Sequence, residues 1–471
     1  MQLSHTRPVV SATFDDPNLV STAGLVPVMK IAKDAGLHHL ADEHLSVPTD
    51  KGANPGLKVA SLVAGMVAGA DSIDDMGVLR HGAMGKVFNK IYAPSTLGSF
   101  LRAFTFGHVR QLDAVASRLL INLGSATPLL GDLDSGQVDE SMVMVDVDDT
   151  IIEVHGYAKQ GSGFGYSGVR GLNALIATVS GSGFAPVIAA SRLRKGNTGS
   201  PRGAARLVAD ALATVKRTVL AGRKILMRGD SAFYGHATIS AALKGGADVS
   251  VTLRADPAVK RAIATIGADA WTKIQYTNAI FDEETGTWIS DAEVAETEFT
   301  AFTSRKKSEQ ITGRLVVRRI PELAPKTPAG QGSLFEAWRF HAFFTTVDAT
   351  VMDTVAADTT HRQHAVIEQA HADLKNGPLA HLPSGKFNAN AAWLVLAVIA
   401  FNLTRTAGTI CGGTHARATC GTIRRRVIAI PARIASSARK LTLHLPENWL
   451  WETAWTKLFE RACGPPKFAT V

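Results

Sequence analysis

A stripe of ionisable side chains between residues 361 and 375 is the part of this sequence best suited to chemistry. Three imidazoles, one carboxylate and one ammonium recur at alternating steps of three and four: His361, His364, Glu368, His371 and Lys375. On an α-helix this spacing places all five on one face. Thr360 with Gln363 predicts the start of the helix, and Gly377-Pro378 predicts its end. Such a stripe suits a metal site, a nucleic-acid site, or both.

The imidazoles raise one alternative, a zinc protein. His361, His364, Glu368 and His371 share a face and are potential Zn²⁺ ligands. Their spacing is not the HExxH pattern, and a rigid helix rarely brings four ligands around one ion. Bound metal after purification, measured by elemental analysis, would identify a zinc protein.

Carboxylates elsewhere in the chain suggest a different use for Glu368. Residues 141–156 alternate apolar and acidic side chains at the period of a strand, so Asp146 and Asp148 project from one face and Asp149 from the other. Asp230 follows a second short strand, 224–227. An acid on an apolar strand is costly to bury unless it is paired, protonated or bound to a cation. Carboxylate oxygens suit Mg²⁺ or Mn²⁺, and two such ions about 4 Å apart can cleave a phosphodiester.

Each acid taken alone also has an ordinary structural explanation. Asp146 or Asp148 would fit a strand edge or a hairpin, Asp230 would fit a helix cap, and Glu368 would fit a surface salt bridge. Only their combination points to catalysis.

The elements that must position these acids form a mixed α/β pattern. Residues 1–135 show helical spacing at 25–41, 58–66 and 96–123. The strand at 141–156 continues into a meander at 172–179 and 185–190, and helices at 202–221 and 235–244 then alternate with strands at 224–227 and 248–253. Residues 271–337 read as a β-rich insertion containing an exposed loop at 321–332, and helices resume with the stripe and at 390–405.

The charge of the chain favours a polyanionic partner. Its 471 residues carry a formal net charge of +9, with a pI near 9.4. Two basic runs contain no acid: Arg192, Arg194, Lys195, Arg202 and Arg206, and then Arg424, Arg425, Arg426, Arg433, Arg439 and Lys440. Charge alone does not separate nucleic acid from an anionic membrane surface, although two clusters plus the global excess favour phosphate contacts.

Other features of composition predict a cytoplasmic protein without a membrane span. The longest apolar run, 391–401, has about half the roughly 20 residues that a span needs, and reads as a buried helix. Cys411, Cys420 and Cys463 lack metal-ligand spacing, and the N-terminus lacks the layout of a signal peptide.

With its acids in this order, the chain resembles the DDE transposases of bacterial insertion sequences, in particular insertion-sequence family 1380. The motifs that carry the resemblance extend nearly end to end: VAGMVAGADSIDDMGVLRHG, APSTLGSFLRAFTFGHVRQLD, MVDVDDTIIEVHG, ILMRGDSAFYG and HRQHAVIEQAHADLKNGPLAHLPSGKFNANAAWLVLAVIAFNLTR. The resemblance implies an RNase H-like, retroviral-integrase-like catalytic core.

It also implies catalytic and metal-binding roles for Asp148, Asp230 and Glu368 with two Mg²⁺ ions, for which Mn²⁺ can substitute. Thr150, two residues after Asp148, favours Asp148 as the first acid, with Asp146 as the alternative. Many relatives carry Tyr-x2-Arg-x3-Glu-x6-Lys around the third acid. This chain retains Glu368 and Lys375 but has His361 and His364 in place of the tyrosine and the arginine.

The expected organisation follows from this resemblance. Five regions are predicted: a DNA-binding helical region (1–135), the two core parts (136–270 and 338–410), the β-rich insertion (271–337), and a basic C-terminal region (411–471). The expected DNA contacts are Lys375, His361, His364, His371, Lys159, Arg170, Arg192, Arg194 and Lys195.

The predicted function is cut-and-paste transposition. The protein would bind the terminal inverted repeats of its element on double-stranded DNA, hydrolyse the ends, and join the 3′-hydroxyls to target DNA as a homodimer. The alternatives are an RNase H-like host nuclease, which would not make strand-transfer products, and a non-catalytic transposase-derived DNA-binding protein, which would be expected to lose an acid.

Overall fold

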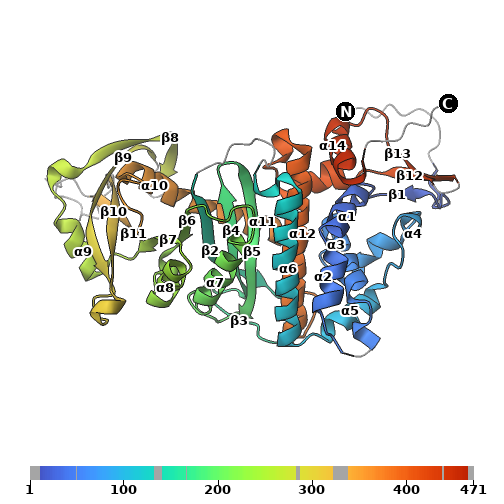
Figure 1. The fold of residues 1–471 in the computed structure, drawn as a ribbon, viewed down its shortest axis with the longest axis horizontal. Coiled ribbons are helices and arrows are strands. Elements are labelled where there is room, and N and C mark those ends of the chain that lie inside the picture. Colours follow the sequence, from blue (N-terminus) through green and yellow to red (C-terminus); the bar gives the residue numbers. More distant parts are fainter. Residues whose placement is uncertain are drawn as a thin grey trace.

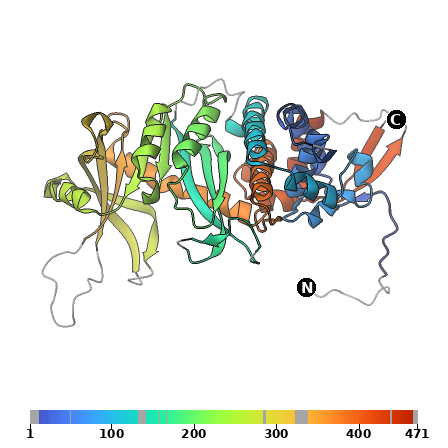
Figure 2. The same cartoon turned by 90° about the horizontal axis from the view of Figure 1, so that it is seen from below.

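The computed structural model describes residues 11–48, 50–131, 141–156, 158–165, 167–282, 287–321, 338–437 and 440–464, with the backbone alone for 276–282, 287–291 and 321. These residues form three parts in a row: a β-rich part, a central sheet with its helices, and a helical body (Figures 1 and 2). Most of the loop expected at 321–332, and Arg439 of the C-terminal basic run, lie outside the described residues.

The central part is built on five strands in the order β5-β4-β2-β6-β7. Strands β2 (Val143–Glu153), β4 (Arg170–Gly181) and β5 (Phe184–Lys195) form the expected antiparallel meander, and β3 (Gly163–Phe164) pairs with the start of β4. Strand β6 (Ile225–Gly229) lies parallel to β2, and β7 (Asp248–Leu253) lies parallel to β6. In chain order this is 3-2-1-4-5 with the second strand antiparallel, the arrangement of an RNase H-like core.

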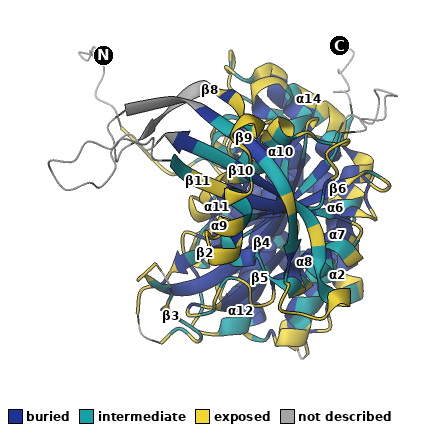
Figure 3. Ribbon diagram, turned by 90° about the vertical axis from the view of Figure 1, so that its left-hand side faces the viewer, coloured by how far each residue is buried: buried dark blue, intermediate teal, exposed yellow. Residues whose placement is uncertain are grey.

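Helices cover this sheet and bury its strands, which are dark in Figure 3. Helix α7 (Ala204–Val215) packs on β5, β4 and β2, and α8 (His236–Lys244) packs on α7 and β7. Helix α11 (Val366–Lys375) contacts β2 and β5. The side chain of Asp146 meets His364 in the turn just before α11 and that of Asp148 meets His371 on α11, whereas Asp149 pairs with Arg194, which bonds the loop that leads into α7. The predicted opposition of Asp149 to the other two acids is therefore confirmed.

The stripe does not lie on one uninterrupted helix. Helix α10 (Thr354–Arg362) begins six residues before Thr360, where the side chain of Asp353 accepts a hydrogen bond from the Ala356 amide. A 3₁₀ turn over Gln363–Ala365 then separates α10 from α11. The predicted start at Thr360 is thus wrong, because the Asp353 cap starts the helical segment earlier in the chain. The predicted end is confirmed, since α11 stops at Lys375, just before Gly377-Pro378.

The β-rich insertion continues the central sheet. It contains α9 (Pro257–Ala264) at its entry and strands β8 (Thr272–Asp282), β9 (Thr287–Ala301), β10 (Ile311–Pro321) and β11 (Trp338–Thr345). Strand β11 pairs with β10 and also with β7. Strand β11, which begins at Trp338, thus joins the insertion to the core sheet, and the expected bounds of the insertion, 271–337, stay a prediction.

The two ends of the chain share the helical body. Its N-terminal elements are β1 (Leu19–Val20), α1 (Leu25–Asp34), α2 (Leu37–His44), α3 (Pro55–Ala68), α4 (Met84–Val87), α5 (Pro94–Arg102) and α6 (Phe106–Ala126). The C-terminal elements are α13 (Cys420–Ile423), β12 (Ala432–Ser437), β13 (Lys440–His444) and α14 (Glu452–Cys463), with β12 paired to β1 and α14 packed on α1. Residues 1–135 and 411–471, expected as separate regions, thus form one body.

Helix α12 (Phe387–Cys411) joins this body to the sheet. It packs against β5 on one side and against α3, α5 and α6 on the other. Among the described residues it is the one helix long and apolar enough to span a membrane, but 89% of its most apolar stretch is buried inside the protein. The expected buried helix is confirmed, and its all-round apolar character reflects partners on every side.

Candidate active site

Two of the three expected acids, Asp148 within β2 and Asp230 directly after β6, come together where the parallel pairing of these strands stops. The register pairs Asp146 with Arg228 and Val147 with Gly229, so Asp148 and Asp230 are the next positions along β2 and β6. Both line a cleft of about 890 Å³. Both carboxylates accept local hydrogen bonds: Asp148 Oδ1 accepts from the Asp149 amide at 2.7 Å, and Asp230 Oδ1 accepts from the Ala232 amide at 2.9 Å.

The electrostatics of this pair favour a cation. The pKa of Asp148 is raised to about 6, chiefly by burial; the Asp149 amide and His364 act to lower it, and the charges of Asp230 and Asp149 act to raise it. Removing a carboxylate from water beside like charges destabilises its ionised form, and a bound cation relieves that cost. Hard oxygen donors in an open cleft fit Mg²⁺ or Mn²⁺.

Glu368 lies in the first turn of α11, and its side chain is exposed. One turn on either side of it, His364 Nδ1 lies 3.0 Å from Asp146 Oδ1 and His371 Nδ1 lies 3.6 Å from Asp148 Oδ2. Within the described part of the chain, however, no three His, Cys, Asp or Glu side chains are close enough to hold one ion. The structure brings Asp148 and Asp230 together and leaves the Glu368 carboxylate outside that pair.

Asp146 has a structural partner. Its carboxylate is 0% exposed and accepts two hydrogen bonds from Arg228, from Nε at 2.6 Å and from Nη2 at 2.8 Å. Arg228 is also buried and donates through Nη1 to the carbonyl oxygen of Thr360. Since the Asp146 oxygens are occupied by Arg228 and His364, we retain Asp148 as the first acid of the site.

The imidazoles of the stripe have internal surroundings. His361 is hydrogen-bonded to Ser250 at 2.8 Å and to Thr252 at 3.0 Å, and its ring stacks on Phe343 with centroids 4.1 Å apart. Burial lowers the pKa of His361 to about 3 and that of His371 to about 4, so both rings are neutral near pH 7. With His364 bonded to Asp146, we do not retain the expected DNA contacts for these three residues. Lys375 is exposed. Partial burial lowers the pKa of its ammonium, and the nearby charge of Asp148 opposes that shift. Lys375 therefore stays a candidate for a phosphate contact.

Most of the basic residues expected to contact DNA are engaged within the fold. Arg194 forms a buried ion pair with Asp149, and Lys159 donates to the carbonyl of Leu382. Arg170 donates to the Gly156 carbonyl and to Ser162 Oγ, bracing the loop between β2 and β4. Lys195 is exposed at the end of β5, two residues before the cleft-lining Asn197, and stays a candidate.

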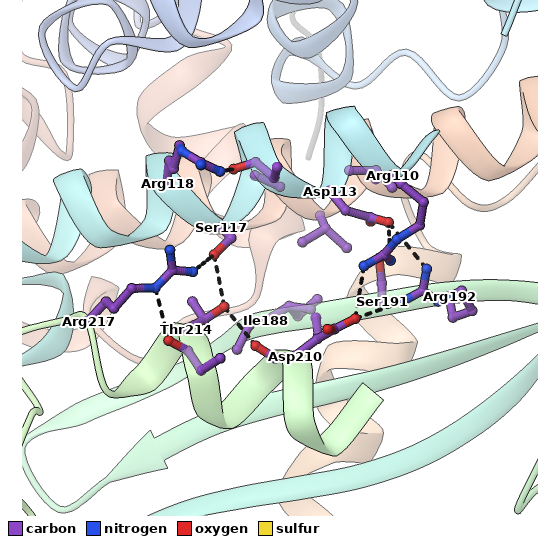
Figure 4. A pocket seen from close by; sticks show the side chains of 17 residues that line it. Arg110, Asp113, Ser117, Arg118, Ile188, Ser191, Arg192, Asp210, Thr214 and Arg217 are labelled. Atoms are coloured by element: carbon purple, nitrogen blue, oxygen red, sulfur yellow. Dashed lines mark hydrogen bonds and ion pairs between the residues drawn. The ribbon is translucent and has the colours of Figure 1, made fainter. Parts of the chain in front are cut away.

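Arg192 belongs to a second, smaller pocket, of about 170 Å³, between α6, α7 and β5 (Figure 4). Its guanidinium pairs with Asp113 of α6 and Asp210 of α7, and Arg110 pairs with the same two acids. This network joins the helical body to the core. The pocket contains neither Asp148 nor Asp230, so we place the chemistry in the larger cleft.

Sequence reasoning missed the residues that fasten α10 to the sheet. Arg228, Ser250 and Thr345 lie in register on β6, β7 and β11, and the first two bond Thr360 and His361. One available signal was Arg228 itself, a lone guanidinium in the apolar strand ILMRG, two residues before an acid. A buried arginine requires an acid, and Asp146 was the nearest candidate on the neighbouring strand.

The strand order, with a carboxylate within β2 and another directly after β6 lining one cleft, defines an RNase H-like core with a cleft suited to cations. The model of one protein family, described as transposase DDE domain group 1, matches residues 3–463, and the chain belongs to that family. It is therefore a DDE-type transposase, of a family that acts on DNA and generally uses divalent metal ions.

No curated protein matches the chain. Among solved structures, it is similar to the piggyBac transposase in a cryo-EM synaptic complex with hairpin DNA, with a TM-score of 0.38 and 9% sequence identity over 96% of this chain and 83% of that one.

Proposed function

We propose that this transposase binds the terminal inverted repeats of its own element, hydrolyses the phosphodiesters at the ends, and joins the freed 3′-hydroxyls to target DNA. The observation that carries the proposal is the pairing of Asp148 with Asp230 at the cleft, beside the helix that holds Glu368. Two ends must be joined in one reaction, so we expect a homodimer to act.

In this proposal Asp148, Asp230 and Glu368 hold two Mg²⁺ ions. When bound, such ions supply the activation of water or of a 3′-hydroxyl and stabilise the departing oxygen. Because Glu368 stands outside the aspartate pair in this structure, its carboxylate has to approach them when DNA and metal bind. Exposed Lys375, on the same face of α11, neutralises a phosphate of the bound strand.

The helical body is proposed to read the repeats. Deleting residues 1–130 would not test this role, because α3, α5 and α6 cover α12, which also packs on β5. Such a truncation would expose the most apolar helix of the chain. Binding is better measured with the full chain, by comparing the retardation of repeat-bearing DNA with that of shuffled DNA.

The test of the activity uses the purified full chain, Mg²⁺, and labelled DNA from the two flanks of its gene. We expect cleavage at the element ends, followed by joined products that require a 3′-hydroxyl donor. Cleavage of structured DNA without any joining would instead favour a host nuclease. Selective binding without cleavage in either Mg²⁺ or Mn²⁺ would favour a non-catalytic derivative.

A further inference from the structure

A second set of three polar residues precedes the candidate acids along the chain, on β2, on β6 and in the 3₁₀ turn that leads into α11. Asp146 precedes Asp148 by two positions on β2, and Arg228 precedes Asp230 by two positions at the end of β6. His364 precedes Glu368 by four positions, at the entry of α11. Two positions on a strand and four on a helix are the steps that return to the same face. Each acid therefore follows one residue of this set, by two positions in the strands and by four positions at the start of α11.

These three residues are joined to one another. Asp146 accepts from Arg228 Nε and Nη2, and its Oδ1 also lies 3.0 Å from His364 Nδ1. Arg228 Nη1 donates to the Thr360 carbonyl, in the last turn of α10, where carbonyl groups lack partners within the helix. The cluster therefore ties β2, β6 and the junction between α10 and α11 together at one point.

The cluster is deeply buried. The side chains of Asp146, Arg228 and His364 are 0%, 1% and 16% exposed. Burying an arginine and an aspartate gains little stability over an apolar pair, because desolvation offsets the attraction. Such a pair instead adds geometric specificity. A planar guanidinium bonded to one carboxylate through two nitrogens fixes β6 against β2 in one register.

We propose that Asp146, Arg228 and His364 are positioning residues that set the spacing of Asp148, Asp230 and Glu368. This inference rests on the proposed function, in which those three acids share the metal ions. Shifting β6 against β2 would separate Asp148 from Asp230. Releasing His364 from Asp146 would free the start of α11, and with it the turn that carries Glu368.

Three variants test this positioning role. His364→Ala removes the bond to Asp146, His364→Gln keeps an N–H donor, and Arg228→Lys keeps the charge but loses the two-nitrogen fork. The control is Arg405→Gln, which breaks the Arg405–Asp373 ion pair, with side chains 6% and 8% exposed, on the side of α11 that faces α12. Every protein is full length, and each is measured for cleavage against Mg²⁺ concentration and for the KM of end DNA.

We expect His364→Ala and Arg228→Lys to raise the half-saturating Mg²⁺ concentration about 10- to 100-fold, the usual effect of losing the support of a metal ligand, with little change in the KM for DNA. His364→Gln should recover much of the loss. Arg405→Gln should lower the thermal midpoint but leave the half-saturating Mg²⁺ concentration unchanged. A wild-type Mg²⁺ dependence in both His364→Ala and Arg228→Lys would overturn the proposal.

A readout without catalysis separates this inference from the proposed function. Hydrogen exchange of the free protein should be faster across Val366–Lys375 in His364→Ala, with β4 unchanged. If wild-type protein shows no cleavage with Mg²⁺, the proposed function fails while this exchange difference still decides whether the cluster holds α11. Identical exchange in α11 would refute the positioning role, whatever the activity.

Discussion

The imidazole of His371 and the carboxylate of Asp148 face each other across the boundary between α11 and β2, with Nδ1 3.6 Å from Oδ2. This contact joins two segments more than two hundred residues apart in the chain. His371 Nε2 is buried without a hydrogen-bond partner, and the pKa of the ring is lowered to about 4, so it approaches Asp148 as a neutral group. A neutral ring leaves the negative charge of Asp148 available to a cation.

The first prediction concerns the aspartate pair. Asp230→Asn or Asp148→Asn should reduce cleavage by a factor on the order of 10³ or more, since removing one member of a catalytic group disables the whole set. Binding of end DNA should persist, because neither change removes a positive charge. Gel retardation and nicking assays on the same preparation measure both properties. Near-normal nicking by Asp230→Asn in Mg²⁺ would refute the assignment.

A second prediction concerns Lys375, which is exposed on the face of α11 near Asp148. Lys375→Ala should weaken DNA binding and reduce the slope of log affinity against log salt by about 1, as expected for one lost phosphate contact. Lys244→Ala is the control, because Lys244 is exposed at the end of α8, which packs on α7 and β7 rather than along the acid-bearing face of β2. Equal salt slopes for the two variants would argue against a phosphate contact at Lys375.

The sequence predicted structural features set by neighbouring residues better than features set by contacts between residues far apart in the chain. Alternation in 141–156 correctly predicted β2 and the opposite directions of Asp148 and Asp149, because strand geometry is local. The sequence did not predict the ion pairs that Arg192 and Arg194 form within the fold. Their partners lie far away in the chain, with Asp149 45 positions from Arg194 and Asp113 79 positions from Arg192. No local sequence pattern reveals such distant pairs. Arginines that form ion pairs within the fold therefore resemble a DNA-binding cluster when only the sequence is considered.

The stripe shows the same limit. Its spacing predicted one shared face, and His364, His371 and Lys375 do lie toward the acids of β2. It did not predict the 3₁₀ turn at Gln363–Ala365, nor that in the last turn of α10, just before it, Arg228 bonds the Thr360 carbonyl and His361 bonds Ser250 of β7. Tertiary hydrogen bonds from the sheet accompany the break in the helix there.

A third prediction follows from the burial of His361. Its pKa is lowered to about 3 in the folded protein, against about 6.5 when unfolded, so between these values the unfolded chain binds the proton. The free energy of unfolding should therefore fall as pH drops below about 6.5, by up to about 1.4 kcal/mol per pH unit from this group. His361→Gln removes the titration, and chemical denaturation at pH 7 and pH 5 should show a smaller difference for the variant. An equal difference in both proteins would contradict this origin.

The fourth prediction is that one of the three thiols reacts with a thiol reagent in the folded protein. Cys411 and Cys420 are buried, and burial raises both pKa values, that of Cys411 to about 12. Cys463 is exposed near the end of α14. Because the thiolate is the reactive form, a colorimetric thiol assay should count one group per chain before unfolding and three afterwards. Cys463→Ser should remove the early signal, and its survival would show that α12 or α13 opens readily.

The last prediction addresses the joint between the helical body and the core. Asp113 of α6 and Asp210 of α7 both pair with Arg110 and Arg192, so the network links three elements from both parts. Asp210→Asn removes one shared charge and leaves two partly buried guanidiniums facing a single carboxylate. We expect it to lower the free energy of unfolding by about 1–3 kcal/mol, as for a charged hydrogen bond left unmade. Lys30 and Asp34 form an exposed pair within α1, and Asp34→Asn is the matched control, expected to cost under about 1 kcal/mol. Urea unfolding of both variants measures the difference, and equal losses would show that the network contributes no more than a surface ion pair.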